Sequence, residues 1–315
     1  MSDHREVAAR PRRFYRDVSG ILLLDKPLGL SSNAALQEAR SIVGALKAGH
    51  AGSLDPLASG LLPVCFGQAT KVCGRLLNAG KTYRVTVRLG ARTESGDGET
   101  QVVERAPVPE MNDALVDAAL ASFAGEQDQV PPMHSALKYE GKRLYEFARR
   151  GESVERPSRR ITIHRLERIG RGTDHLEFDV RCSKGTYVRT LAADIAVRLG
   201  TIGYVESLRR LSIDPFDGCA MHTLEELSRS PGAQADRLFL PADLAFADLV
   251  SVQVSPECEK LLLLGQNVSV LEGRVSHGQF RAYGASGRFL GLVEGLPDGR
   301  VKPVRLFVTS GGRPA

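Results

Sequence analysis

The sequence lacks a long hydrophobic run. None of its 315 residues falls in an apolar stretch of about 18, the length that a transmembrane helix requires. The segment 1–17 holds five arginines and no apolar core, so we expect no secretory signal. We expect a mobile basic tail over residues 1–19, a cytoplasmic location and no membrane partner.

Metal-binding patterns are missing as well. The five cysteines are scattered without a CxxC pair, and the seven histidines form no HExxH or HxH array. We therefore expect reduced thiols and no metal site.

What remains is the profile of a soluble globular protein. The chain is 42% hydrophobic and 25% charged, and its length suggests about two domains. The net charge of +5 and the pI near 9.0 permit a polyanionic partner without demanding one.

The stretch Lys47–Pro63 is rich in glycine and proline and is too interrupted for one regular helix or strand. Its only carboxylate is Asp55, directly before Pro56. Asp55 is either a held acid with a chemical role or the N-cap of a helix that starts at Pro56. The stretch by itself leaves both interpretations open.

Periodicity places further residues on regular elements. Alternation over Lys81–Leu89 indicates a half-buried strand with Tyr83 on its inner face. A helix that follows Ser183 and reaches about Leu199 has Arg189 in its first turns, where a cation opposes the helix dipole, so a carboxylate partner is expected. Other elements are expected as strands at Gly20–Pro27, Ile161–Ile169 and His175–Cys182, helices at Asn33–Ala45, Gln68–Leu77, Asn112–Phe123 and Thr223–Ser228, and a strand pair or extended segment at Tyr204–Phe216.

The segment Gln129–Gly151 interleaves aromatic and basic residues. Its cations are Lys138, Lys142, Arg143, Arg149 and Arg150. Such a mixture suits a nucleic-acid surface, where cations meet phosphates and rings stack on bases. A solvated amphipathic helix with an apolar underside (Leu144, Phe147, Ala148) explains it equally well.

The chain changes character near its end. After a boundary at Pro231–Leu249, the residues from Val252 to Val308 form short alternating runs between glycine turns, among them Asn267–Val270 and Gln279–Tyr283. This pattern predicts a small all-β module of barrel type.

Several short motifs follow one another along the chain: Gly49–Pro63 with Gly67–Lys71, Lys81–Tyr83, Thr93–Asp97, Pro131–Gly151, Cys182–Arg189 and Leu208–Arg210. In these motifs, and from about Gly20 to Val308, the chain resembles the bacterial TruB-type family of tRNA pseudouridine synthases. Ala51 and Ser53 stand where the family commonly has threonine, and Gly203-Tyr204 stands where it usually has a small residue and a histidine, which leaves the role of that segment open.

The resemblance implies an α+β pseudouridine synthase fold. Its central mixed, mostly antiparallel sheet is flanked by helices and followed by a small C-terminal all-β PUA-like barrel. We expect the catalytic domain at 20–247, with an RNA-binding insertion at 129–151, and the PUA-like RNA-binding domain at 248–315.

The implied reaction isomerises uridine 55 in the T loop of tRNA to pseudouridine, without metal or cofactor. The flipped-out base would meet Asp55 as nucleophile. Arg189 would be its counter-ion, against a desolvation that favours the neutral acid. Tyr83 would stack on the uracil and assist proton removal at C5. Tyr187 and Leu208 would wall the pocket, and His50 would fill the vacated space or contact RNA. Without the resemblance these four are ordinary structural residues.

The implied partner is tRNA, held by its T arm and through the C-terminal module at its acceptor end; we expect a monomer. One alternative is a guide-RNA-dependent synthase, against which the long insertion argues. Another is a non-catalytic tRNA-binding or tRNA-folding protein, against which Asp55, Tyr83 and Arg189 argue.

Overall fold

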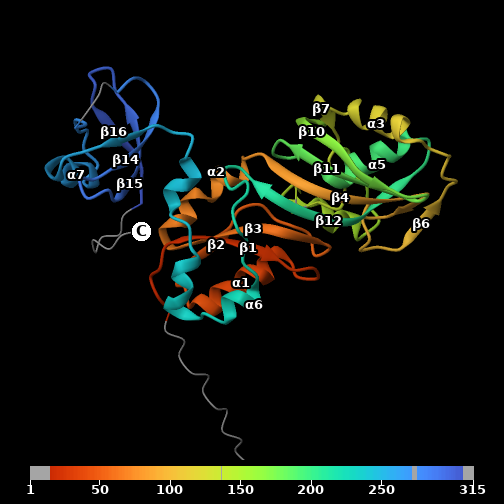
Figure 1. Cartoon of the computed structure of the whole chain (residues 1–315), viewed down its shortest axis with the longest axis horizontal. Helices are drawn as coiled ribbons and strands as arrows, with labels where there is room; N and C mark the ends of the chain where they lie inside the picture. Colours follow the sequence, from red (N-terminus) through yellow and green to blue (C-terminus); the bar gives the residue numbers. More distant parts are fainter. Residues whose placement is uncertain (1–14, 136, 272–274, 308–315) are drawn as a thin grey trace, which may run out of the picture.

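The computed structural model describes residues 15–135, 137–271 and 275–307. The molecule is elongated, with a small C-terminal sheet at one end and helix α3 (Asp113–Ala121) at the other (Figure 1). Most of the expected basic tail at 1–19 lies outside the described residues.

One large sheet forms the frame of the molecule. All its neighbouring strands are antiparallel except β12 and β3, so the mixed, mostly antiparallel sheet expected from the sequence is confirmed. The strand β2 (Ala48–His50) pairs with β3 beside the main path. In spatial order the main path is β1 (Gly20–Lys26), β3 (Ala58–Phe66), β12 (Gly203–Ile213), β4 (Lys81–Leu89), β11 (His175–Cys182), β10 (Arg159–Arg171) and β7 (Gly125–Gln129).

Helices cover the two halves of this sheet differently. The β1–β3 half is covered on both faces. The apolar residues with even numbers enter one core, which they share with α1 (Ser32–Val43), α6 (Leu224–Ser228) and the 3-10 helix η2 (Gly232–Leu238). Those with odd numbers enter another, which they share with η1 (Gly67–Val72), α2 (Cys73–Leu77) and η3 (Ala242–Phe246).

The β4–β11 half is covered on one face only. The inner residues of β4 and β11 pack against α3 and α5 (Val188–Arg198). The other face carries exposed ion pairs such as Arg84–Asp179. A short pair, β5 (Ala91–Thr93) and β6 (Val102–Arg105), lies beyond β4.

Local sequence signals explain several elements. The helix α1 begins where expected, since the Ser31 side chain accepts from the Ala34 N–H, and it ends at Gly44 with φ of 69°. The expected helix at Gln68–Leu77 is η1 followed by α2, and the segment after Tyr204 is the single strand β12. The strand β3 was not predicted, because its first residues belong to the glycine- and proline-rich stretch.

The four-stranded C-terminal sheet confirms the predicted β module, with β13 (Ser251–Gln253), β14 (Gln279–Tyr283), β15 (Phe289–Gly295) and β16 (Val301–Leu306). The strand predicted at Asn267–Val270 is wrong: only an isolated bridge joins Val268 to Val301. The helix α7 (Pro256–Leu263), capped by Ser255, was also missed.

Candidate active site

Asp55 lies in a tight turn just before β3. The Ala58 N–H donates to the Asp55 carbonyl at 3.0 Å, and the chain enters β3 at Ala58. The helix-cap interpretation is therefore wrong, since no helix follows Pro56. The buried Ser32 hydroxyl fixes the turn by bonding the N–H and the carbonyl of Leu54 at 2.7 and 2.9 Å. The Asp55 side chain is 49% exposed, so it faces an open site rather than a dry pocket.

Arg189 faces Asp55 from the first turn of α5. Its Nη2 lies 3.1 Å from the Asp55 carboxylate, and its Nη1 lies 3.0 Å from that of Asp97, whose side chain is 1% exposed. The guanidinium also donates to the carbonyls of Ser95 and His134, at 3.0 and 2.7 Å. These contacts fix the orientation of Arg189. They also provide the carboxylate partner expected for a cation near the N-terminus of a helix.

Asp97 was not singled out in the sequence. Its carboxylate accepts from the Ser95 hydroxyl at 2.5 Å and from the Glu99 N–H at 3.1 Å, which leaves its other oxygen for Arg189. The one available signal was the polar turn Thr93–Asp97, in which Asp97 is the carboxylate with a buried side chain.

Tyr83 and Leu208 lie on neighbouring strands in the core beside the turn. Leu208 pairs with Val85 on one side and with Ala58 on the other, and both Tyr83 and Leu208 are nearly buried. Burial raises the pKa of the Tyr83 phenol, and the nearby Asp55 charge adds to this, while the positive Arg210 opposes it.

Tyr187 is the residue before α5, held by a side chain from the base of the insertion. The Gln129 amide accepts from the Tyr187 N–H at 2.8 Å and donates to its carbonyl at 3.1 Å. Gln129 is buried, and it was predicted only as the first residue of the insertion.

His50 lies on β2, opposite Val64 of β3. Its Nδ1 is buried and, within the described residues, has no hydrogen-bond partner. Burial lowers the His50 pKa, and the positive Arg210 lowers it further. A neutral imidazole is therefore favoured near pH 7.

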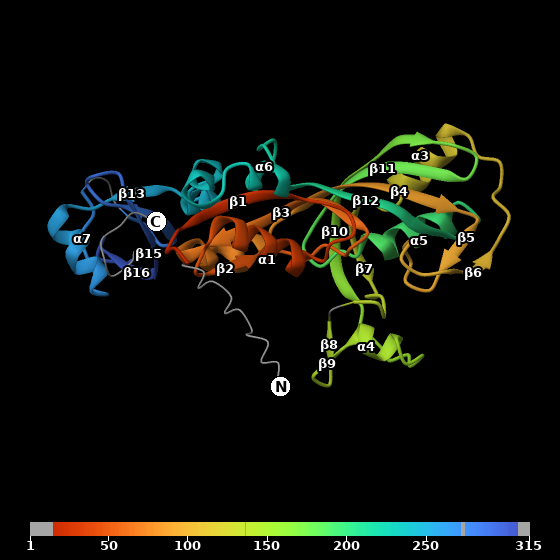
Figure 2. The ribbon, with the colours of Figure 1, turned by 90° about the horizontal axis from the view of Figure 1, so that it is seen from below.

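The insertion is not a single helix. Figure 2 shows it projecting from the body as a hairpin, β8 (Lys138–Tyr139) and β9 (Lys142–Arg143), followed by the short helix α4 (Leu144–Ala148). The solvated-helix interpretation is right only about the underside, because Leu144, Phe147 and Ala148 are buried. The five predicted cations are exposed on this projection, outside the Asp55–Arg189 cluster; Arg149 and Arg150 lie over the rings of Tyr145 and Phe147.

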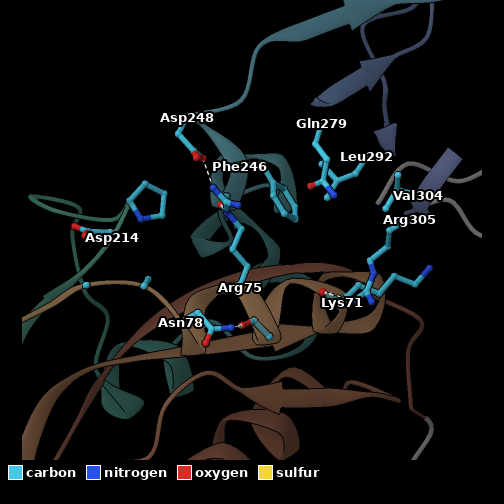
Figure 3. Close-up of a pocket in the computed structure, with 15 residues that line it drawn as sticks. Lys71, Arg75, Asn78, Asp214, Phe246, Asp248, Gln279, Leu292, Val304 and Arg305 are labelled. Carbon is cyan, nitrogen blue, oxygen red and sulfur yellow. Dashed lines mark hydrogen bonds and ion pairs between the residues drawn. The ribbon is translucent and has the colours of Figure 1, made fainter. Parts of the chain in front are cut away.

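A separate cleft of about 820 Å³ lies between α2 and the C-terminal sheet (Figure 3). Arg75 crosses one wall of it, donating to the Ala245 carbonyl at 2.7 Å, stacking over Phe246 and pairing with Asp248. None of the predicted site residues lines this cleft, so it is distinct from the Asp55 cluster.

Among the described residues, no three His, Cys, Asp or Glu side chains gather as a metal ion would require. No described helix is both long and apolar enough to cross a membrane.

Three family models match consecutive parts of the chain. They are the TruB family pseudouridylate synthase N-terminal domain at residues 40–188, the tRNA pseudouridylate synthase B C-terminal domain at 189–247, and the pseudouridine synthase II TruB C-terminal domain at 251–307.

Full-length relatives are similar as well. The chain is 46% identical to the tRNA pseudouridine synthase B of Chromohalobacter salexigens over 95% of this chain and 97% of that protein. It is 47% identical to the protein of that name from Azoarcus sp. (96% and 98%) and 44% identical to the one from Yersinia pestis (96% and 96%).

Solved structures share the fold. The chain aligns with a protein chain of a Cbf5-Nop10-Gar1 complex at a TM-score of 0.71 and 22% identity, over 96% of this chain and 88% of that one. A chain of the archaeal box H/ACA sRNP Nop10-Cbf5 complex aligns at 0.67 and 20% identity, over 92% and 86%.

Proposed function

Because the chain belongs to the TruB family of pseudouridylate synthases, we propose that it converts uridine 55 in the T loop of tRNA to pseudouridine, without a guide RNA. The observation that carries the proposal is the pair Asp55–Arg189 at 3.1 Å, inside a chain 44–47% identical to proteins named tRNA pseudouridine synthase B. Enzymes of this family are isomerases, so the substrate atoms are rearranged and none is gained or lost.

Asp55 is the nucleophile of this proposal. The N1–C1′ bond breaks, the base rotates, and a C5–C1′ bond forms; C5 then loses its proton and N1 gains one. A carboxylate assists by attacking C1′ or C6, or by promoting loss through a glycal. The half-exposed Asp55 side chain is open to an extruded nucleotide, and Arg189 holds it from behind.

The other predicted residues frame the base. Tyr83 stacks on the flipped uracil and takes part in proton removal at C5, while Tyr187 and Leu208 form walls. His50 occupies the space that the base leaves in the RNA. Supporting this arrangement, Leu208 on β12 pairs with Val85, two residues after Tyr83 on β4, and on its other side with Ala58, which closes the Asp55 turn.

We propose the insertion as a clamp on the T arm. Lys138, Lys142, Arg143, Arg149 and Arg150 contact phosphates, and the C-terminal sheet reaches the acceptor end. The exposure of these cations on the projecting hairpin and directly after α4 supports the proposal. We also propose that the enzyme acts as a monomer in the cytoplasm.

The domain division is proposed at residues 20–247 and 248–315. A separate sheet that starts at β13, with its own apolar core around Val254, Leu262 and Leu290, supports this boundary.

The test follows release of tritium from [5-³H]uridine in an unmodified tRNA transcript. We expect the purified chain to release tritium and form pseudouridine at position 55 without added RNA, and Asp55→Asn to abolish release while tRNA binding survives. The matched control is Asp174→Asn, which removes a surface carboxylate that is 44% exposed and paired with Arg88. It should release tritium like the wild type.

Three outcomes would overturn the proposal. Wild-type-like release by Asp55→Asn would remove Asp55 from the chemistry. Release that requires an added guide RNA would favour the guide-dependent alternative. Binding without any release by the wild-type chain would favour a tRNA-binding or tRNA-folding protein.

A further inference from the structure

Arg210 is the largest fully buried side chain of the described residues, and it lies beneath the candidate active site. Its relative exposure is 1%. Within the described part of the chain it forms no ion pair with a carboxylate, and its guanidinium donates to two backbone carbonyls. A buried charge without a carboxylate is costly, and a fold that keeps one needs several well-aligned hydrogen bonds.

Two of these hydrogen bonds close the loop that carries Asp55. Arg210 Nε donates to the Leu61 carbonyl at 2.6 Å, and Nη2 donates to the Gly52 carbonyl at 3.0 Å. Gly52 precedes Asp55 and Leu61 follows it, so a single guanidinium joins the two ends of the loop.

Gly52 leaves room for this contact. Its φ is +86°, and a Cβ added there would meet Arg210 Nη1 at 3.4 Å. A side chain at position 52 would therefore be strained by the positive φ, and its Cβ would contact the guanidinium.

Arg210 also lies beside Tyr83. The two residues are directly paired across β12 and β4, so their side chains share one face of the sheet. Burial raises the pKa of the Tyr83 phenol, and the positive Arg210 opposes this rise. The other groups that act on Tyr83 are Cys182 on β11 and Asp55, and both raise its pKa.

We propose that Arg210 is a positioning residue for the removal of the C5 proton. It fixes the Asp55 loop beside Tyr83 by holding the Gly52 and Leu61 carbonyls. The Tyr83 phenol oxygen accepts the proton from C5 while the phenol proton passes to water. The C5–H electron pair restores the C5–C6 double bond, the C6–N1 π pair moves to N1, and N1 takes a proton from water. This inference rests on the proposed function and on the proposed place of Tyr83 beside the base.

The chemistry of the side chain explains why arginine is suited to this position. A guanidinium directs N–H donors in a planar fork, and here two backbone carbonyls accept from it. A lysine would keep the charge but concentrate its donors at one atom, so it would not span both carbonyls. Two other cations lie near Arg210. Burial lowers the pKa of Lys26 and of Lys81, and the Arg210 charge lowers both further.

The experiment compares Arg210→Lys with Arg209→Lys. Arg209 is the adjacent residue of the same strand, but its guanidinium forms a half-buried pair with Asp25 at 2.7 Å and reaches only the Ser59 hydroxyl of the loop, at 3.5 Å. Single-turnover pseudouridine formation is measured with tRNA carrying protium or deuterium at C5. We expect Arg210→Lys to slow the reaction at least tenfold, with tRNA affinity within about twofold of wild type, and Arg209→Lys to react normally.

Two readouts separate positioning from a merely structural role. We expect the C5 deuterium isotope effect to be larger in Arg210→Lys than in the wild type, because proton removal becomes more rate-limiting. We also expect the rate loss from Arg210→Lys to shrink at least threefold in a Tyr83→Phe background. An unchanged isotope effect together with additive rate losses would overturn the inference.

Tyr83→Phe alone keeps the test decisive if Arg210→Lys does not fold, because it removes only a hydroxyl. An isotope effect that Tyr83→Phe leaves unchanged would overturn the inference. A wild-type chain that forms no pseudouridine would contradict the proposed function, and this inference with it. Normal wild-type turnover with unchanged isotope effects would contradict the inference alone.

Discussion

The carboxylate of Asp55 and the guanidinium of Arg189 lie 3.1 Å apart and differ sharply in exposure. The Asp55 side chain is 49% exposed and the Arg189 side chain 11%. The cation is thus held by the protein on one side and presents its charge to an accessible carboxylate on the other. A site built in this way is ordered before substrate arrives, which spares the reaction the cost of reorienting its charges.

We predict that Asp97→Asn slows pseudouridine formation by about 10- to 100-fold, equivalent to about 1.4–2.8 kcal/mol of transition-state stabilisation. The change removes the buried carboxylate that orients Arg189. Breaking a buried pair should also lower the free energy of unfolding by about 3–5 kcal/mol. Single-turnover rates and urea unfolding measure the two effects.

The control for this change is Asp179→Asn, which breaks a pair with Arg84 on the open face of the sheet. It should cost less than about 1 kcal/mol and leave the rate unchanged. An Asp97→Asn variant that reacts at the wild-type rate would show that Arg189 needs no second carboxylate.

We predict that Gln129→Leu destabilises the chain by about 1–3 kcal/mol and slows the reaction. The buried Gln129 amide makes two hydrogen bonds to the Tyr187 backbone, and its loss leaves these groups unpaired. The matched control is Gln127→Leu, two residues earlier on β7, whose side chain makes one bond to the Phe123 carbonyl. Equal effects of the two variants on the rate would contradict a role for Gln129 in holding Tyr187.

We predict that the double variant Lys138→Ala/Arg149→Ala weakens tRNA binding and flattens its salt dependence. Each lost phosphate contact should reduce the slope of log K against log salt by about 1. A salt titration of binding measures it. The double variant Arg171→Ala/Arg229→Ala, at exposed arginines paired with Asp113 and Glu225, should keep the slope. An unchanged slope in the Lys138→Ala/Arg149→Ala variant would indicate that these two cations are solvated and do not contact tRNA phosphates.

We predict that wild-type stability falls more steeply on acidification below pH 6.5 than that of His50→Asn. Burial, followed by the Arg210 charge, lowers the His50 pKa in the folded chain. Between that lowered pKa and the ordinary 6.5, the unfolded chain binds the extra proton, so stability is lost as the pH falls. Urea unfolding across this range measures the difference, and parallel pH profiles would contradict it.

The sequence supported the prediction of elements with a clear local signal. The helix α1 begins after the N-cap Ser31 and ends at Gly44, residue types that are common at these two ends of a helix. The alternation around Tyr83 placed this residue on the inner face of β4. The interpretation in which Asp55 caps a helix at Pro56 is wrong, because Asp-Pro also suits a turn that leads into a strand. Nothing local distinguishes the two, since the choice depends on β3 pairing with β1 and β12.

The candidate site was predictable only in part. The position of Arg189 predicted a carboxylate partner. The spacing in the sequence does not reveal that Asp97 is such a partner, because their contact depends on the fold. Gln129 and Arg210 also act on backbone groups far away in the sequence, and such acceptors exist at every residue. Their selection depends on the three-dimensional packing.

The base of the insertion has a consequence for shortening or grafting this protein. Gln129 holds Tyr187, and the His134 carbonyl accepts from Arg189 at 2.7 Å, so residues 129–135 are structurally part of the site. A truncated chain that keeps its site must retain this base and be rejoined beyond it. Replacing the hairpin and α4 would remove the proposed phosphate contacts, whereas replacing the base would remove the contacts to Tyr187 and Arg189 as well.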